Sequence, residues 1–112
     1  MEFTSSLIKN YEFKRLYRKG KNAASKHVVV YSMKNGKTEN KLGITVSTKL
    51  GGAVTRNRIR RRLKEIYRLN ENDLLTGFNI VIIARVASRD AGWNELESSV
   101  LHLFRKLDLI KR

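Results

Sequence analysis

Arginine is concentrated in one segment of the chain. Residues 56–68 read RNRIRRRLKEIYR, with six arginines, one lysine and a single acid, Glu65. A guanidinium group binds phosphate through two parallel hydrogen bonds, whereas an ammonium group acts as a point charge. A face that only meets solvent would mix the signs, because like charges three or four residues apart destabilise a helix. The segment therefore predicts a surface that binds a polyanion through its phosphates.

Two glycines before this segment add a weaker signal of the same kind. Gly51 and Gly52 lead directly into the expected helix, whose first backbone N–H groups have no partner within the helix. Such a helix start can bind a phosphate. The GK[ST] ending of a nucleotide-binding P-loop is missing, so the glycines alone do not identify a site.

Aromatic residues form a second pattern. Phe13 and Tyr17 lie one helical turn apart, and Tyr31 shares a strand face with Val29. One interpretation is that these side chains pack into the core. The other is a groove with an apolar floor and a cationic wall, provided that the basic helix borders this strand face. Such a groove suits single-stranded nucleic acid, whose bases stack while its phosphates are neutralised.

The sequence shows no residues for catalysis by the protein itself. The acids are scattered without a clustered pair or triplet, and the chain has no cysteine. His27 and His102 are isolated in sequence, and we expect them to be surface or boundary residues rather than an acid–base pair. No serine-centred nucleophile motif is present. We therefore expect no catalytic residue and no metal site in this chain.

Length and charge limit the class of protein. The 112 residues fit one domain over residues 1–112, and 24 Lys and Arg against 10 Asp and Glu give a formal charge of +14. This excess opposes a compact state, which indicates a polyanionic partner: nucleic acid first, an anionic membrane surface second. The longest apolar run, residues 80–84, is far below the roughly 20 residues of a membrane span. Without a signal-peptide pattern at the N-terminus, we expect a cytoplasmic protein. We also expect no small-molecule substrate.

The pattern of apolar and turn residues predicts an α+β fold in which one sheet packs with helices. We expect helices over residues 8–19, 54–69 and 93–107, and strands over 27–34, 41–48 and 79–86. Gly20 is predicted to end the first helix in a left-handed conformation. The first two of these strands are predicted to form an antiparallel hairpin, and the unbroken apolar run of the third suits a central position.

The basic helix also has an apolar stripe. At 100° per residue, one face gathers the four apolar residues Ile59, Leu63, Ile66 and Tyr67. This stripe is predicted to pack on the sheet, which leaves the basic side chains on the rest of the helix. A helix lying on a membrane surface is therefore disfavoured, and we expect no membrane partner.

Residues 49–61, KLGGAVTRNRIRR, resemble the signature of the bacterial ribonuclease P protein component, whose part A-V-x-R-N-R-x-(K/R)-R matches residues 53–61. The resemblance extends over nearly the whole chain, including the I-V-I-I-A-R strand at residues 80–85 and H-L-F-R-K at 102–106. It implies a short extra strand near residues 21–24, and hence a mixed four-stranded sheet in the order α-β-β-β-α-β-α. It also implies an unusual left-handed βαβ crossover through the basic helix.

The resemblance implies a function as well. The chain would be the protein subunit of a bacterial, cytoplasmic endoribonuclease that removes the 5′ leader of precursor tRNA. Its partners would be the catalytic RNA of ribonuclease P and the precursor tRNA. The catalytic centre would lie in that RNA, which requires Mg²⁺, and the protein itself would bind no cofactor. The alternative is a generic basic RNA-binding or ribosome-associated module with no role in cleavage.

Residue roles follow from the resemblance by position. The residues expected at the catalytic RNA are Lys49, Arg56, Asn57, Arg58, Arg61, Arg62 and Arg68. The residues expected in the cleft for the precursor tRNA leader are Phe13, Tyr17, Val29, Tyr31, Arg60 and Lys64. The family often begins with a basic arm, whereas this chain begins MEFTSS, so no RNA contact is predicted for that stretch.

Overall fold

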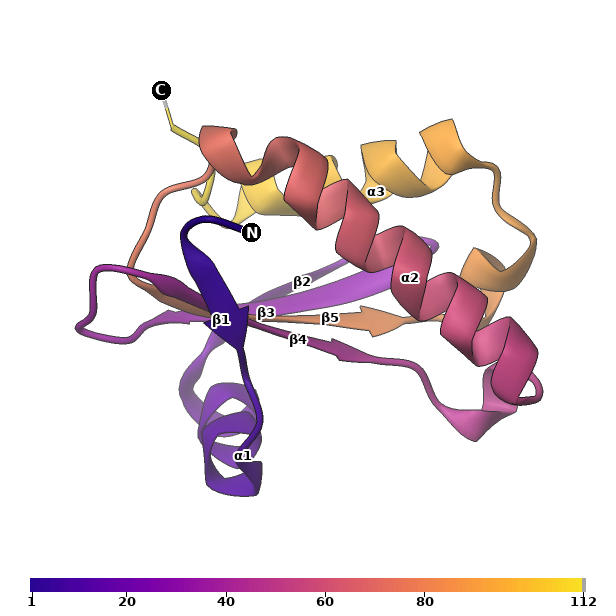
Figure 1. The fold of residues 1–112 in the computed structure, drawn as a ribbon, viewed down its shortest axis with the longest axis horizontal. Coiled ribbons are helices and arrows are strands. Elements are labelled where there is room, and N and C mark those ends of the chain that lie inside the picture. The colour runs from indigo at the N-terminus through magenta and orange to yellow at the C-terminus, as the bar shows by residue number, and fades with distance from the viewer. Residues whose placement is uncertain (112) are drawn as a thin grey trace.

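The computed structural model describes residues 1–111. One five-stranded sheet has the strand order β1-β4-β5-β3-β2, and three helices pack against it (Figure 1). The strands are β1 (Thr4–Ser6), β2 (Lys21–Ala24), β3 (Val28–Lys34), β4 (Asn40–Thr45) and β5 (Phe78–Ala84). The helices are α1 (Asn10–Lys19), α2 (Ala53–Asn70) and α3 (Trp93–Lys106), with short 3₁₀ turns at Thr48–Leu50, Glu71–Asp73 and Val86–Asp90.

The helices divide unequally between the two faces of the sheet. Helices α2 and α3 lie side by side over one face, and α1 lies alone on the other (Figure 1). The main core fills the space under α2 and α3, where Val30, Ile80 and Ile82 of the sheet are fully buried. A smaller cluster under α1 is centred on Leu16 and Val81. The short α1 therefore leaves part of its sheet face only half-buried.

The α+β fold is confirmed, and so are the extra strand at residues 21–24 and the central position of β5. Strand β5 pairs antiparallel with β3 and parallel with β4, which explains its almost continuous apolar run. The sheet has one strand more than the four expected. The additional strand is β1, which pairs parallel with the outer side of β4.

The expected hairpin of the strands at 27–34 and 41–48 is wrong. Strands β3 and β4 follow each other in the chain, but β5 lies between them in the sheet. The short connection over residues 35–39 allows a hairpin but does not require one. The long apolar strand β5 is buried on both faces when it takes the central position. It then lies between β3 and β4, so these two strands cannot pair with each other.

The connection from β4 through α2 to β5 is left-handed, as the resemblance implies. In Figure 1, β1 is nearest to the viewer, so the strand order places β5 behind β4. The chain runs to the right along β4, returns to the left through α2 above the sheet, and runs right again along β5. This path turns counterclockwise as it recedes, which is the rare hand for such a unit.

The prediction that Gly20 ends α1 in a left-handed conformation is wrong. Gly20 has φ −73° and ψ 158°, which any residue can adopt. Glycine is needed here for space instead. A Cβ atom at this position would lie 2.5 Å from the carbonyl oxygen of Leu16 and 3.0 Å from that of Ser32. The absence of a side chain lets the chain pass from α1 directly into the edge strand β2.

Candidate nucleic-acid interface

Helix α2 separates its apolar and basic residues as predicted. Ile59, Leu63, Ile66 and Tyr67 are fully buried against the sheet and α3, and the basic side chains emerge around the rest of the helix. The helix begins at Ala53, directly after Gly52, and Val54 is 85% exposed in its first turn. The first turn of α2 is therefore open to a partner.

Several guanidinium groups of α2 also bind the protein itself. Arg58 and Arg62 donate hydrogen bonds to the carbonyl oxygens of Arg89 (3.2 Å) and Ala91 (3.0 Å), in the connection before α3. Arg56 donates to the carbonyl oxygen of Gly51 at 3.2 Å. These three residues therefore fix the loop before α2 and the connection before α3, in addition to the RNA role predicted for them.

Of the remaining residues predicted at the catalytic RNA, three lie along the exposed side of the same helix, and the fourth, Lys49, lies before it. Arg68 forms an ion pair with Glu65, and the hydrogen bond from Arg68 lowers the pKa of that carboxyl group. Arg61 is exposed and forms no ion pair with any residue in the range 1–111. Lys49 is exposed in the 3₁₀ turn before α2, and the side chain of Asn57 accepts a hydrogen bond from Arg60.

The aromatic residues predicted for the leader cleft form one group of rings. The centroids of Phe13 and Tyr17 are 6.3 Å apart, and those of Tyr17 and Tyr31 are 5.1 Å apart in an edge-to-face arrangement. Tyr17 is 40% exposed, and Phe13 and Tyr31 are half-buried against the smaller core. The rings thus pack on the sheet and still present part of their surface. Val29 is half-buried on the same face of β3 as Tyr31.

A cavity of about 400 Å³ joins this aromatic group to the basic helix. Helix α2 lies on the opposite face of the sheet from α1, but its side chains Arg60 and Lys64 reach the edge of β4 and line the same cavity as Phe13. The basic helix thus borders the aromatic face across a strand edge. Tyr17, Val29 and Tyr31 lie beyond this cavity, farther along the sheet face.

Two features of this cavity were missed by the reasoning from sequence. A Cβ atom at Gly43 would lie 2.8 Å from the ring of Phe13, so this ring rests directly on the backbone of β4. A glycine inside an otherwise alternating strand is the signal that could have indicated such a close approach. Strand β1 also lines the cavity, through Thr4 and its neighbours, although the sequence pattern predicts no helix or strand for the N-terminal stretch.

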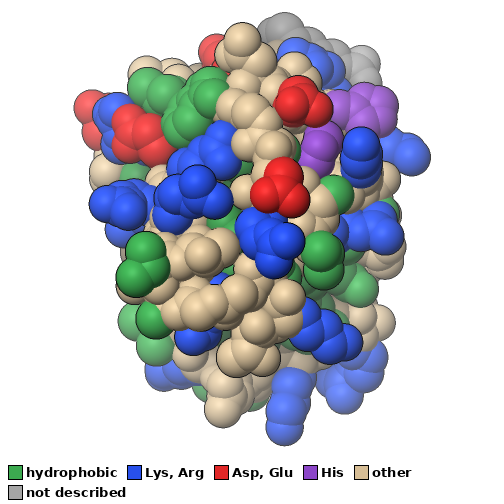
Figure 2. Space-filling view, turned by 90° about the vertical axis from the view of Figure 1, so that its right-hand side faces the viewer, with side chains coloured by type: hydrophobic (Ala, Val, Ile, Leu, Met, Phe, Trp, Pro, Cys, Tyr) green, Lys and Arg blue, Asp and Glu red, His purple; other side chains and the backbone are tan. Residues whose placement is uncertain are grey.

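The charge around this region is uneven. Figure 2 shows the face that lies on the right of Figure 1. Its acidic side chains are confined to the upper half, on the side of α2 and α3, whereas the lower half shows Lys and Arg side chains and no acidic ones. A strand of nucleic acid on this lower half would meet positive charge without acidic neighbours.

The histidines divide between core and surface. His27 is 8% exposed, and its Nδ1 lies 2.6 Å from the Ser99 hydroxyl of α3, so the expectation of a surface or boundary position is wrong for this residue. It packs inward because β3 begins under α3. His102 is exposed. Within residues 1–111 no three His, Asp or Glu side chains are placed together to hold a metal ion. None of the helices in this range combines the length and apolar character that crossing a membrane requires.

Comparison with known proteins gives one consistent result. The model of the family described as Ribonuclease P matches residues 1–108. A ribonuclease P protein component of Alkaliphilus metalliredigens is 42% identical over 110 residues, which cover 98% of this chain and 99% of the relative. A protein of the same name from Clostridioides difficile is 42% identical over 107 residues, with 95% and 94% of the two chains covered.

Solved structures agree in fold. The ribonuclease P protein of Staphylococcus aureus superimposes with a TM-score of 0.87 at 32% identity, covering 97% of this chain and 98% of that one. The corresponding protein of Thermotoga maritima gives a TM-score of 0.82 at 30% identity, with 90% and 96% covered.

Proposed function

This chain belongs to the ribonuclease P protein family, and we propose that it holds the catalytic RNA on helix α2 and the 5′ leader of precursor tRNA in the aromatic cleft. As a protein component of ribonuclease P, it is a subunit of the endoribonuclease that matures the 5′ end of tRNA, and it works in a ribonucleoprotein. The assignment of the two RNA partners to two surfaces is the proposal.

The observation that supports this assignment best is the cavity at the edge of β4. It places Arg60 and Lys64 beside Phe13, and the rings of Tyr17 and Tyr31 continue the apolar surface from there. Cations beside aromatic faces are the combination that binds single-stranded nucleic acid with little sequence preference. The rest of α2 offers its basic side chains away from this cavity, so a second RNA can bind at the same time.

The protein would act by positioning and by neutralising charge. The aromatic rings would stack leader bases, and Arg60 and Lys64 would neutralise leader phosphates. Holding the leader fixes the precursor against the catalytic RNA and raises the effective concentration of the scissile bond at the catalytic centre. In our proposal the divalent ions belong to the RNA partner.

Reconstitution tests this function directly. Precursor tRNA would be incubated at low Mg²⁺ with the protein alone, with a ribonuclease P catalytic RNA alone, and with both. We expect cleavage at the mature 5′ end only in the combined sample, because the protein offsets charge that Mg²⁺ otherwise has to neutralise. Cleavage by the protein alone would contradict the proposal. A combined sample no faster than the RNA alone would favour a generic RNA-binding module.

Tyr31 provides a test of the cleft. Tyr31→Ala should weaken holoenzyme binding of leader-bearing precursor tRNA by roughly 1–3 kcal/mol, which is the value of one base–aromatic stack. Binding of mature tRNA, which has no leader, should change little. The two affinities can be measured by fluorescence anisotropy of labelled tRNAs.

Tyr31→Phe is the matched control, because it keeps the ring and its contact with Tyr17. It should bind precursor tRNA like the wild type. If Tyr31→Ala weakened precursor and mature tRNA equally, Tyr31 would be a core residue without a role in leader binding.

A further inference from the structure

A second cavity lies on the other side of helix α1. It measures about 420 Å³ and is bordered by α1, the ends of β3 and β4, and the loop that joins these two strands. None of the thirteen residues predicted to contact RNA lines this cavity. Its size is within the range of cavities that bind small ligands.

The lining has a strong excess of positive charge. Four cations come from four separate parts of the chain, namely Arg15, Lys34, Lys37 and Lys41, and Glu12 is the only acid among the lining residues. Glu12 is already used, because it forms an ion pair with Lys41 at 3.1 Å. Within residues 1–111 the other three cations have no ion-pair partner. Three unpaired cations around one cavity repel one another, which favours the binding of an anion there.

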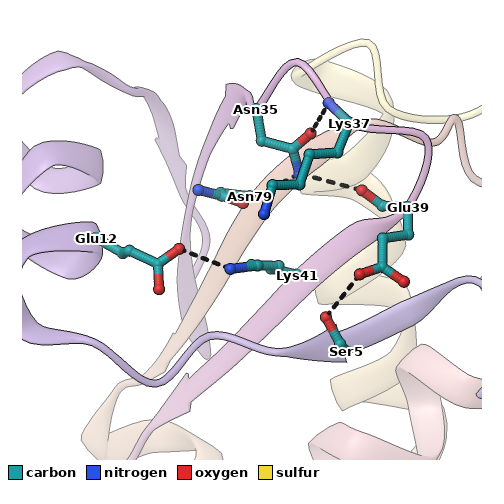
Figure 3. A network of polar contacts seen from close by, with 7 residues as sticks. All are labelled: Ser5, Glu12, Asn35, Lys37, Glu39, Lys41 and Asn79. Carbon is teal, nitrogen blue, oxygen red and sulfur yellow. Dashed lines mark hydrogen bonds and ion pairs between the residues drawn. The ribbon is translucent and has the colours of Figure 1, made fainter.

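The loop that brings two of these cations together is held in place. The Asn35 side chain accepts a hydrogen bond from the backbone N–H of Lys37 at 2.8 Å, and it donates to the carbonyl oxygen of Glu39 and to Asn79, both at 3.1 Å. Figure 3 shows Lys37 reaching back from this loop toward Asn79, on the same side as the Lys41 ammonium group. The cations are therefore presented by an ordered turn, which lowers the entropy cost of binding.

The cavity also has an aromatic and an apolar component. Tyr11 lines it and is 65% exposed, although it lies on α1 only two residues from the cleft residue Phe13. Met33 contributes a flexible apolar surface from β3. An exposed ring, a thioether and several cations match a nucleotide, which has a flat base and a phosphate.

We propose that this cavity is a further RNA site, which binds one nucleotide of single-stranded RNA through its phosphate on Lys34 and Lys37 and its base on Tyr11. The inference rests on the function proposed above and adds a site to it. The nucleotide has two possible sources with the same chemistry: the distal part of the leader, or an unpaired segment of the catalytic RNA. The experiment below separates them.

The test uses holoenzyme assembled with Lys34→Ala/Lys37→Ala. We expect precursor tRNA or catalytic RNA to bind roughly 3- to 30-fold more weakly, because both cations that hold the phosphate are lost. The slope of log K against log salt should become shallower by about 0.7, since the site neutralises one phosphate of a single strand. The matched control is Arg105→Ala/Lys106→Ala, which removes the same charge from the exposed end of α3, on the opposite face of the sheet.

Two series of ligands identify the source. Precursors with leaders of roughly 2 to 16 nucleotides would show a loss only for the longer leaders if the site binds the leader. Catalytic RNA alone would show the loss if the site binds that RNA. In either case Tyr11→Ala should weaken the same ligand. The proposal is overturned if the double variant matches the control in affinity and salt slope. If the proposed function itself were wrong, the result would differ, because the wild-type protein would then not increase cleavage of precursor tRNA by the catalytic RNA.

Discussion

Glu71→Ala should detach the N-terminal strand and lower the free energy of unfolding by about 2–4 kcal/mol. Glu71 is only 5% exposed, and its carboxylate accepts hydrogen bonds from the backbone N–H groups of Glu2 (2.9 Å) and Phe3 (3.2 Å) and from the Thr4 hydroxyl. Hydrogen bonds to a charged group are worth more than neutral ones, and alanine would leave the donors without their partner.

The carboxylate is the end point of a longer polar chain. The Asn40 amide donates to the Tyr67 hydroxyl at 3.2 Å, and this hydroxyl lies 2.7 Å from the Thr4 hydroxyl, which donates to Glu71. Burial raises the pKa of Tyr67, although the hydrogen bonds with Thr4 and Asn40 act in the opposite direction. Tyr67 therefore remains a neutral donor toward Thr4. Removing Glu71 would disturb the partners of several buried groups together.

The charge of Glu71 makes this stabilisation depend on pH. Burial acts to raise its pKa, but the hydrogen bonds from Thr4, Glu2 and Phe3 outweigh this and lower the pKa below its usual value. In the acidic range the unfolded chain then binds the proton more tightly than the folded one. The stabilisation is therefore complete above about pH 4.5 and is lost as the pH falls through the lowered pKa. Glu71→Gln, which is neutral at every pH, should lack this component.

Urea unfolding at several pH values measures the effect, and proteolysis or amide hydrogen exchange reports on residues 1–7 separately. Glu2→Gln is the matched control, because it removes an acid from the N-terminal segment itself, and the exposed Glu2 side chain forms no hydrogen bond or ion pair within residues 1–111. An unchanged midpoint for Glu71→Ala, or a difference between wild type and Glu71→Gln that does not shrink at acidic pH, would contradict this account.

The sequence predicted the parts of the fold that follow from local pattern. The stripe from Ile59 to Tyr67 has helical spacing, and packing against other elements of the chain removes it from water. The unbroken run in β5 likewise requires cover on both faces. In both cases the free energy gained by burying the apolar side chains is larger than differences in helix or strand propensity. The apolar pattern therefore determines the structure.

Strand neighbours and short elements could not be predicted in this way. The choice between a β3–β4 hairpin and an inserted β5 is a tertiary competition for the central position. Strand β1 has three residues, TSS, with no apolar alternation, and its pairing depends on the distant Glu71. The strand is therefore stabilised by contacts nearly seventy residues away in sequence, which no local pattern records.

The interface shows the same division. The arginines of α2 could be identified from composition, but only the structure shows that Arg58 and Arg62 also fasten the loop before α3. It likewise shows that Arg60 and Lys64 reach the aromatic cluster around the edge of β4, where Gly43 leaves room for Phe13. Arginines that look alike in the sequence therefore differ in their roles: the loss of some would lower stability, and the loss of others would weaken RNA binding.

Arg60→Glu/Lys64→Glu should separate binding from stability. We expect precursor tRNA to bind more weakly by roughly 2–4 kcal/mol. Each of the two substitutions removes a contact of about 1 kcal/mol with a phosphate and adds a repulsion of similar size. The wild-type slope of log K against log salt should be about −4 to −5 for six phosphate contacts, and the variant slope should be shallower by about 1.5.

The stability of the free protein should move in the opposite direction. Lys64 forms no ion pair or hydrogen bond within residues 1–111, and Arg60 only donates to Asn57 on its own helix. Glutamate at position 60 would lie four residues from Arg56, and glutamate at 64 four residues from Arg68. Each new pair favours the helix by about 0.3–0.5 kcal/mol, so the melting temperature should stay the same or rise.

Arg58→Ala/Arg62→Ala is the contrasting variant, because it removes two side chains that bind loop carbonyl groups and should therefore lower the melting temperature. Fluorescence anisotropy with leader-bearing and mature tRNA, together with thermal unfolding, measures both quantities. If Arg60→Glu/Lys64→Glu weakened the two tRNAs equally, these residues would contact RNA outside the leader cleft. If it left both affinities unchanged, the cavity at the β4 edge would have no role in RNA binding. A weaker affinity for the precursor with undiminished stability is the result that only a binding surface, and not a structural one, can produce.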